Sequence, residues 1–240
     1  MEEDLELPWI NISLEEKLYE IFNELSINSE EKTSVESFLA PLKYKDKISR
    51  YHYYHCIRVG IIAREIARFM HLDEKALFYS GLLHDIGKSH VCLELLAKAD
   101  VRLGSNGEWT QENAKEMERH VIDGYNLLRD KFYFIAEIIV RHHKYQINDY
   151  PKELPAPLHK YSAGTEVLVG VYSRILALAD VYDAIHRLNN KLNREPTEDE
   201  VKESLVKFSS DINFLVEDLY KHHVLPMSYL YGGQDVNNKN

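Results

Sequence analysis

The sequence of 240 residues contains only two cysteines, Cys56 and Cys92, and they form no CxxC pair. Two isolated cysteines exclude a disulfide-rich scaffold and a zinc site built on thiolates. Long hydrophobic runs are also lacking, because stretches such as FYFIAEIIV fall far short of the roughly 20 residues that span a bilayer. The first residues, MEEDLELPWI, are acidic where a secretion signal would be basic. We therefore expect a cytoplasmic protein that does not enter a membrane.

Positive charge is scarce as well. The chain has 29 lysines and arginines against 39 aspartates and glutamates, a formal net charge of −10. This balance argues against a broad basic surface for duplex nucleic acid. A small anionic ligand would instead need a local positive centre, and a bound metal ion would supply one.

Glycine and proline are sparse up to about residue 150, and apolar residues recur at helical spacing. These patterns predict an all-α protein. Eight longer helices are expected, over residues 13–25, 32–39, 51–70, 73–84, 90–98, 110–129, 132–143 and 167–185. Two more should follow, one capped by Thr197 and one by Ser209 or Ser210. The irregular stretch 144–165 is long enough to form a lid or one wall of a site.

We expect one globular domain with three parts. Residues 1–50 form an N-terminal helical extension packed on the core, residues 51–190 form the core, and residues 191–240 form C-terminal helices and a disordered tail. The terminal helices carry no motif. Their apolar faces either cover the core or form a homodimer.

Seven polar residues lie on or at the ends of otherwise apolar helices. They are five histidines and two aspartates: His55, His84, Asp85, His120, His142, His143 and Asp180. Each alone has an ordinary explanation, because a single histidine on an apolar face is more often a hydrogen-bonded core residue than a metal ligand. Asp180 alone could pair with Arg174 or Arg187.

Taken together, the seven residues are harder to explain as ordinary core residues, because buried carboxylates almost always need a cationic partner. A pair of divalent ions would satisfy all of them. Imidazoles and carboxylates without thiolates are typical ligands of iron, manganese, zinc or nickel. Asp85, adjacent to His84, could bridge the two ions.

The segments HCIRVG, LLHDIGK, ERHVIDG, VRHH and ILALADVYDA occur in this order between residues 51 and 187. Their order of H, HD, H, HH and D resembles that of the HD-domain metal-dependent phosphohydrolases. The segment HDIGK, the H-x-x-x-G of His120 and Gly124, and LADVYDA are most similar to the HD-GYP branch, whose members hydrolyse cyclic di-GMP. The resemblance implies an HD-domain helical bundle.

Two departures from that branch stand out. HD-GYP proteins typically read HHExxDGxGYP, whereas this chain reads HHKYQINDYP, with Lys144 in place of the acid and no glycine before Tyr150 and Pro151. Some members hold a third metal with a glutamate four residues before the first histidine, where this chain has Tyr51. We therefore expect two metals, iron or manganese.

The resemblance implies a division of the ligands between the two ions. One ion would be held by His55, His84, Asp85 and Asp180. The other would be held by His120, His142, His143 and the bridging Asp85. A metal-bound hydroxide would then attack phosphorus, so that no nucleophile from the protein is needed.

Several residues around this set have candidate roles. Lys88, one helical turn beyond His84, could contact a phosphate oxygen and act in catalysis with Asp85, although a solvated lysine at a helix end is the plainer explanation. Asp183 could orient a ligand histidine. Lys144 and Arg187 are further candidate phosphate contacts, and surface charge explains them equally well. His52 is the main rival of His55 for the first ligand position.

Two functions remain open at this point. The first is a metal-dependent phosphohydrolase that cleaves a nucleotide phosphodiester, with cyclic dinucleotides such as cyclic di-GMP as the first candidates and phosphomonoesters next. The alternative is a catalytically silent signalling module of the same fold that binds a nucleotide or a protein partner. The intact ligand set favours the enzyme.

Overall fold

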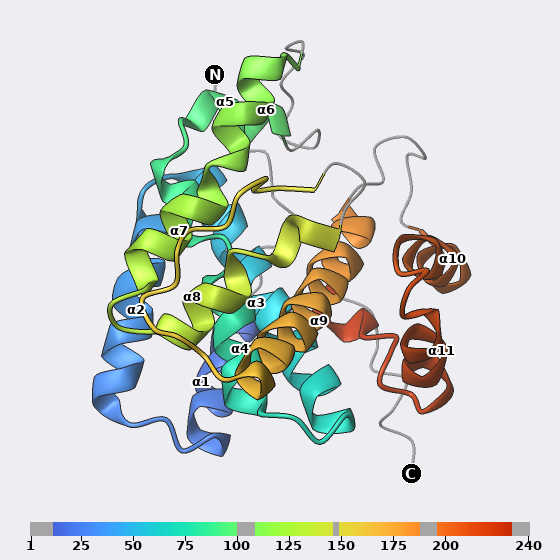
Figure 1. The fold of residues 1–240 in the computed structure, drawn as a ribbon. Coiled ribbons are helices and arrows are strands. Elements are labelled where there is room, and N and C mark those ends of the chain that lie inside the picture. Colours follow the sequence, from blue (N-terminus) through green and yellow to red (C-terminus); the bar gives the residue numbers. More distant parts are fainter. Residues whose placement is uncertain (1–11, 100–108, 146–148, 188–195, 232–240) are drawn as a thin grey trace.

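The computed structural model describes residues 12–99, 109–145, 149–187 and 196–231 (Figure 1). Within these ranges every regular element is a helix and no strand occurs, so the predicted all-α fold is confirmed. No helix in the same ranges is both long and apolar enough to cross a bilayer. The predicted disordered tail falls on residues 232–240, outside the described part.

Helices α3 (Lys47–Phe69) and α4 (Glu74–Leu83) form the centre of the bundle. Each begins at an aspartate cap: Asp46 accepts from the amide of Ser49 at 2.8 Å, and Asp73 accepts from that of Ala76 at 2.9 Å. The two helices touch backbone to backbone, because a Cβ at Gly81 would lie 2.5 Å from the Cα of Gly60. This contact holds the end of α4 against the middle of α3.

The N-terminal helices α1 (Ile12–Glu24) and α2 (Ser29–Tyr44) pack on α3. Helix α2 is longer than the predicted 32–39 and continues through Pro41, so the predicted end before this proline is wrong. A proline inside a helix removes one backbone hydrogen bond. Here the buried side chains of Leu39 and Leu42 flank Pro41, and their packing keeps the helix intact.

The predicted helix 110–129 is two helices, α6 (Gln111–Glu118) and α7 (His120–Leu128). None of the side chains of α6 is buried, whereas α7 buries one face in the core. Arg119 between them keeps helical backbone angles, and its amide bonds to the carbonyl oxygen of Glu116 three residues earlier at 3.3 Å, so the α-helical bonding is interrupted there. His120 is the first residue of α7. Between α4 and α6 lie the 3₁₀ helix η1 (Ile86–His90) and α5 (Leu93–Ala99).

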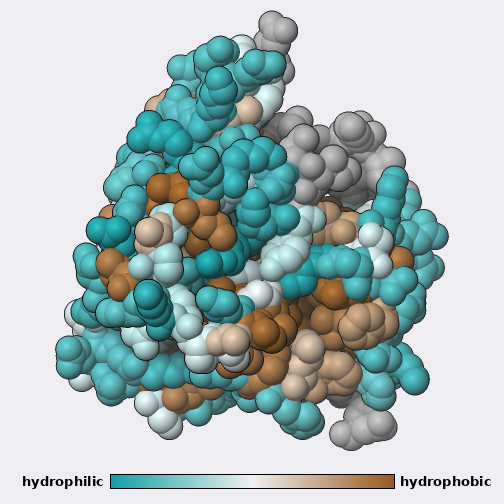
Figure 2. All heavy atoms as spheres, viewed as in Figure 1, coloured by the Kyte–Doolittle hydropathy of each residue, from teal (hydrophilic) through white to brown (hydrophobic). Residues whose placement is uncertain are grey.

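The predicted helix 132–143 is also divided, into α8 (Tyr133–Ile139) and the 3₁₀ helix η3 (His142–Tyr145). The long helix α9 (Ala163–Arg187) packs on α3, α4 and α8. On the face shown in Figure 2, hydrophobic surface gathers along α9, where Val167, Leu168 and Val171 are exposed.

Two helices follow α9, namely α10 (Glu198–Phe208) and α11 (Asn213–Lys221), and the 3₁₀ helix η5 (Ser228–Tyr231) ends the described chain. Thr197 caps α10 as predicted. Neither Ser209 nor Ser210 caps α11. Ser209 is buried at the carboxyl end of α10, where its amide bonds to the carbonyl oxygen of Leu205 at 2.9 Å. One cluster of buried hydrophobic side chains includes residues from α1 to η5, so both ends of the described chain contribute to one core.

The contact between α3 and α4 gives a stability test. Alanine at Gly81 would press on the backbone of Gly60, so Gly81→Ala is expected to lower the free energy of unfolding by about 2 kcal/mol or more. Gly170 in α9 is the matched control, because a Cβ there meets nothing within 4 Å. Gly170→Ala should be neutral or stabilise by up to about 1 kcal/mol. Urea unfolding of both variants checks this, and equal stability would contradict the close contact.

Candidate metal centre

The structure brings all seven sequence-predicted ligands together, although they come from elements far apart in the chain. Helix α3 provides the first histidine, the end of α4 the HD pair, the start of α7 the next histidine, η3 the paired histidines and α9 the last aspartate. They form three overlapping groups whose facing atoms lie within 4.8 Å of one another: His55, His84 and Asp85; His84, His142 and Asp180; and His120, His142 and His143.

Glycines allow these elements to meet. A Cβ at Gly87 in η1 would overlap the carbonyl oxygen of His120 and lie 2.6 Å from the amide nitrogen of Gly124, so only a glycine fits there. At Gly124 itself a Cβ would make ordinary contacts, 3.4 Å from the side chain of Ile139 and 3.5 Å from the amide nitrogen of Gly87. The close approach at Gly87 sets Asp85, just before η1, beside His120 at the start of α7.

The imidazole rings are oriented through Nδ1. In His84, His120 and His142 this atom bonds to the backbone carbonyl oxygen three residues earlier, at 2.8, 2.6 and 2.5 Å. In His55 it bonds to a carboxylate oxygen of Asp183 at 2.7 Å. Carbonyl and carboxylate oxygens only accept, so Nδ1 carries the proton and Nε2 keeps its lone pair. Each of these rings thus presents to the centre the nitrogen that binds a metal.

Asp85 lies between two sets of histidines. Its Oδ2 is 3.3 Å from Nε2 of His55 and 3.4 Å from Nε2 of His84, whereas its Oδ1 is 3.2 Å from Nε2 of His120. The side chain is 1% exposed. Burial opposes its charge, but His84 and the ammonium of Lys88 outweigh burial and hold the pKa of Asp85 well below its usual range. One ionised carboxylate therefore points a separate oxygen at each set.

Asp180 adds the second carboxylate. Its Oδ1 lies 3.3 Å from Nε2 of His55 and 3.8 Å from Nε2 of His84. Burial opposes its charge too, yet the close contact with His55 and the other histidines nearby lower the pKa of Asp180. Burial lowers the pKa of His142 to about 3 and that of His143 well below its usual value. Both rings are therefore neutral at neutral pH, which is the form that binds a metal.

The donor atoms fit bound cations. Nε2 of His120, Nε2 of His142 and Oδ1 of Asp85 are fully buried and have no hydrogen-bond partner among the described residues. Buried polar atoms without partners cost free energy, and a divalent cation accepts lone pairs from imidazole and carboxylate alike. The sequence pattern indicated this set because each member lies on or at the end of an otherwise apolar helix.

Of the predicted residues outside the ligand set, two contact a candidate ligand and two are not seen to do so. Lys88 reaches the centre, with its Nζ 2.5 Å from Oδ2 of Asp85. Asp183 contacts His55, as described. Lys144 does not reach the centre in this structure, because its Nζ bonds to Asp149 at 2.6 Å and to the carbonyl oxygen of Pro151 at 3.1 Å. The side chain of Arg187 lies outside the described part.

His52, the rival of His55, is buried but belongs to none of the three groups formed by the described residues. Its neighbour His55 belongs to the first. The separation of three residues along α3 turns the two side chains toward different surroundings. The ring of His52 lies near that of Tyr51, with their centroids 5.8 Å apart.

Three further residues at the centre were not predicted. Arg58 is fully buried and its Nε donates to Oδ1 of Asp183 at 2.5 Å. Its position one turn after His55 on an apolar helix is a signal that could have revealed it. Tyr150 lies over His143, with ring centroids 4.4 Å apart. Tyr231 donates to Oδ1 of Asp183 at 2.9 Å, and no sequence pattern around it points there.

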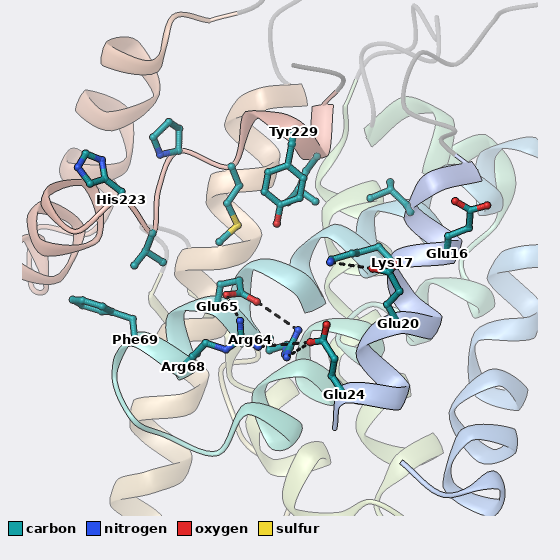
Figure 3. A pocket seen from close by; sticks show the side chains of 15 residues that line it. Glu16, Lys17, Glu20, Glu24, Arg64, Glu65, Arg68, Phe69, His223 and Tyr229 are labelled. Carbon is teal, nitrogen blue, oxygen red and sulfur yellow. Dashed lines mark hydrogen bonds and ion pairs between the residues drawn. The ribbon is translucent and has the colours of Figure 1, made fainter. Parts of the chain in front are cut away.

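A pocket of about 720 Å³ lies elsewhere on the molecule (Figure 3). Charged side chains of α1 and α3, such as Glu24, Arg64 and Arg68, form one side of it, and the segment with His223 and Tyr229 forms the other. None of the seven residues of the metal centre lines this pocket. The polar groups suited to metal chemistry are thus separate from this cavity.

Comparison with known proteins agrees with the geometry. The 3'3'-cGAMP-specific phosphodiesterase 1 of Vibrio cholerae is 27% identical over 170 residues, which are 68% of this chain and 35% of that protein. The chain thus spans about a third of the length of this curated relative. The HD domain of the phosphodiesterase PgpH of L. monocytogenes shares the fold, with a TM-score of 0.50 and 16% identity over 80% of this chain and 91% of that one.

The family comparison covers the whole candidate metal centre. The family described as HD domain matches residues 52–185, which is more than half of the chain and includes His55, Asp180 and every candidate ligand between them. Members of this family depend on metals, and the His and Asp groups of this chain are able to bind them. The chain belongs to the HD domain family.

Proposed function

We propose that the chain is a metal-dependent phosphodiesterase that holds two divalent cations, iron or manganese, and hydrolyses a nucleotide phosphodiester. The observation that carries the proposal is the placement of Asp85. Its two oxygens face different sets of histidines, at 3.3 and 3.4 Å on one side and 3.2 Å on the other. A carboxylate so placed suits a bridge between two cations.

His55 and His84 lie beside one oxygen of Asp85 and His120 beside the other, and we assign the remaining candidates by the groups that they form with these histidines. His55, His84 and Asp180 would hold one cation, and His120, His142 and His143 the other, with Asp85 shared. Together the cations would activate a water molecule at neutral pH and stabilise the oxygens of a displacement at phosphorus. The protein then needs no nucleophilic side chain of its own.

Two further residues support the candidate ligands: one orients a histidine and the other binds the substrate. Asp183 accepts the Nδ1 proton of His55, so the lone pair of that ring is on Nε2, the atom that would bind a cation. Lys88 reaches Asp85 and carries the positive charge nearest to it, so we assign it to a phosphate oxygen of the substrate. We prefer Lys88 to Lys144, because Lys88 contacts the candidate ligand Asp85, whereas Lys144 bonds to Asp149, which is not one of the candidate ligands.

Cyclic dinucleotides are the substrate class we propose. The curated relative is named for hydrolysis of one such compound, 3'3'-cGAMP, and the motifs of this chain resemble those of the cyclic di-GMP hydrolases. A dianionic substrate also suits the chemistry, because the two bound cations would supply local positive charge on a chain whose net charge of −10 otherwise repels anions.

Elemental analysis tests the metal content. Protein purified without added metal, or reconstituted with manganese or ferrous iron, should contain about two ions per chain. Treatment with a chelator should lower the melting temperature, because bound ions stabilise only the folded state. Asp85→Ala should hold fewer ions than His222→Ala, in which an exposed histidine at the end of α11 is removed. A wild-type chain that binds no metal after reconstitution would refute the proposal.

Hydrolysis assays test the reaction. With manganese or ferrous iron, the chain should cleave bis(p-nitrophenyl) phosphate and at least one member of a panel of cyclic dinucleotides. His84→Ala and Asp85→Ala should abolish cleavage, whereas His222→Ala should keep it. If the metal-loaded wild type cleaves nothing yet binds a dinucleotide, the chain is a binding module and not an enzyme.

The role of Lys88 has its own test. Lys88→Ala should lower kcat by about 100-fold with unchanged metal content, because it removes a charge that stabilises the transition state. Lys88→Arg should restore part of the rate. Lys98→Ala, which removes a lysine paired with Glu94 on α5, is the control and should leave kcat unchanged. Equal rates for Lys88→Ala and the control would remove Lys88 from the mechanism.

A further inference from the structure

We propose that Tyr231, in the C-terminal element η5, is a positioning residue for the metal centre. Its hydroxyl fixes the carboxylate of Asp183, and that carboxylate orients the ligand His55. The inference rests on the proposed function, because it assumes that His55 binds a metal. It assigns a role to a part of the chain outside residues 52–185, the range that the family matches.

The chain of contacts is short and continuous. The hydroxyl of Tyr231 donates to Oδ1 of Asp183 at 2.9 Å, and Oδ2 of Asp183 accepts from Nδ1 of His55 at 2.7 Å. The carboxylate is fully buried. Tyr231 and His55 thus each bond to a different oxygen of the Asp183 carboxylate. Loss of the tyrosine hydroxyl would leave the rotation of this carboxylate less restricted.

Arg58 contributes to the same carboxylate but does not replace the hydroxyl. Its Nε donates to Oδ1 at 2.5 Å, and its Nη2 lies 3.4 Å from Oδ2. These bonds neutralise the charge of Asp183 from the side of α3. The hydroxyl of Tyr231 approaches from η5 and so fixes the carboxylate from a second direction.

The position of Tyr231 is itself well defined. Its ring stacks on that of His186 in α9, with centroids 4.1 Å apart and planes 2° from parallel. The guanidinium of Arg58 lies 5.7 Å from the centroid of the same ring. Upstream, the amide of Met227 donates to the hydroxyl of Tyr182 at 2.9 Å, which anchors the segment that leads to η5.

A purely structural clamp on the C-terminal segment is the competing explanation. Such a clamp would affect stability alone, whereas a positioning residue affects how tightly the metal is held. Partners that orient a ligating histidine typically contribute 10- to 100-fold to metal affinity. Because Tyr231 acts through Asp183, we expect an effect near the lower end of this range.

Tyr231→Phe is the decisive variant, since it removes the hydroxyl and keeps the ring that stacks on His186. Tyr54→Phe is the matched control. It deletes another tyrosine hydroxyl, one that donates to Glu15 at 3.1 Å, from the residue next to His55. Mn²⁺ affinity is measured by titration calorimetry and by competition with a chelating indicator, and the melting temperature is recorded for the metal-free chains.

The proposal expects Tyr231→Phe to bind Mn²⁺ about tenfold more weakly at one of the two sites, and Tyr54→Phe to bind as the wild type does. Visible spectra of the Co²⁺-loaded chains should change in Tyr231→Phe only. Wild-type affinity and spectrum in a folded Tyr231→Phe would overturn the inference and leave the proposed function intact. A wild type that binds no Mn²⁺ would overturn both. A wild type that binds Mn²⁺ but hydrolyses nothing would overturn the proposed function alone.

Discussion

The burial of two carboxylates and five imidazoles in one place is the constraint on which the rest of this fold depends. Isolated buried charges are costly, and a helical core tolerates them only when neighbouring groups satisfy them. Asp85 is 1% exposed, and histidines from α3, α4 and α7 surround it. Every element of the central bundle contributes a group or a backbone carbonyl to this arrangement.

Close backbone packing makes the arrangement rigid. Gly60 and Gly81 bring α3 and α4 into contact, and Gly87 brings η1 onto α7. The Nδ1 bonds of His84, His120 and His142 go to main-chain oxygens one turn back. The directions of these rings therefore follow from the helices themselves, and they need few contacts with mobile side chains.

Much of this centre could be predicted from the sequence, because a polar residue at a helix position where the pattern predicts an apolar one is easily noticed. His55 and Asp180 each lie on an apolar face, and the HD pair ends an apolar helix, so their convergence could be predicted. The boundary at Arg119 could not be predicted, because helical periodicity continues through it and Arg119 itself keeps helical backbone angles. Helix α2 continues past Pro41 because packing outweighs a missing hydrogen bond.

Contacts between residues far apart in the chain could not be predicted from sequence patterns. Tyr231 is far from Asp183 in sequence and lies among residues without a periodic signal, so nothing short of the folded chain places it. Lys144 illustrates the converse. Its position beside the paired histidines suggested a phosphate contact, but a local partner, Asp149, holds it.

The ligand set begins in α3 and ends in α9, and this spread has a consequence for how the centre forms. A fragment that ends at α5 would retain His55, His84 and Asp85 but none of the histidines of α7 and η3. The complementary fragment would lack the shared carboxylate. Neither piece of the chain could assemble the complete set, so under the proposed function metal occupancy would report the folding of the whole bundle. The free energy of metal binding would then be part of the free energy of folding.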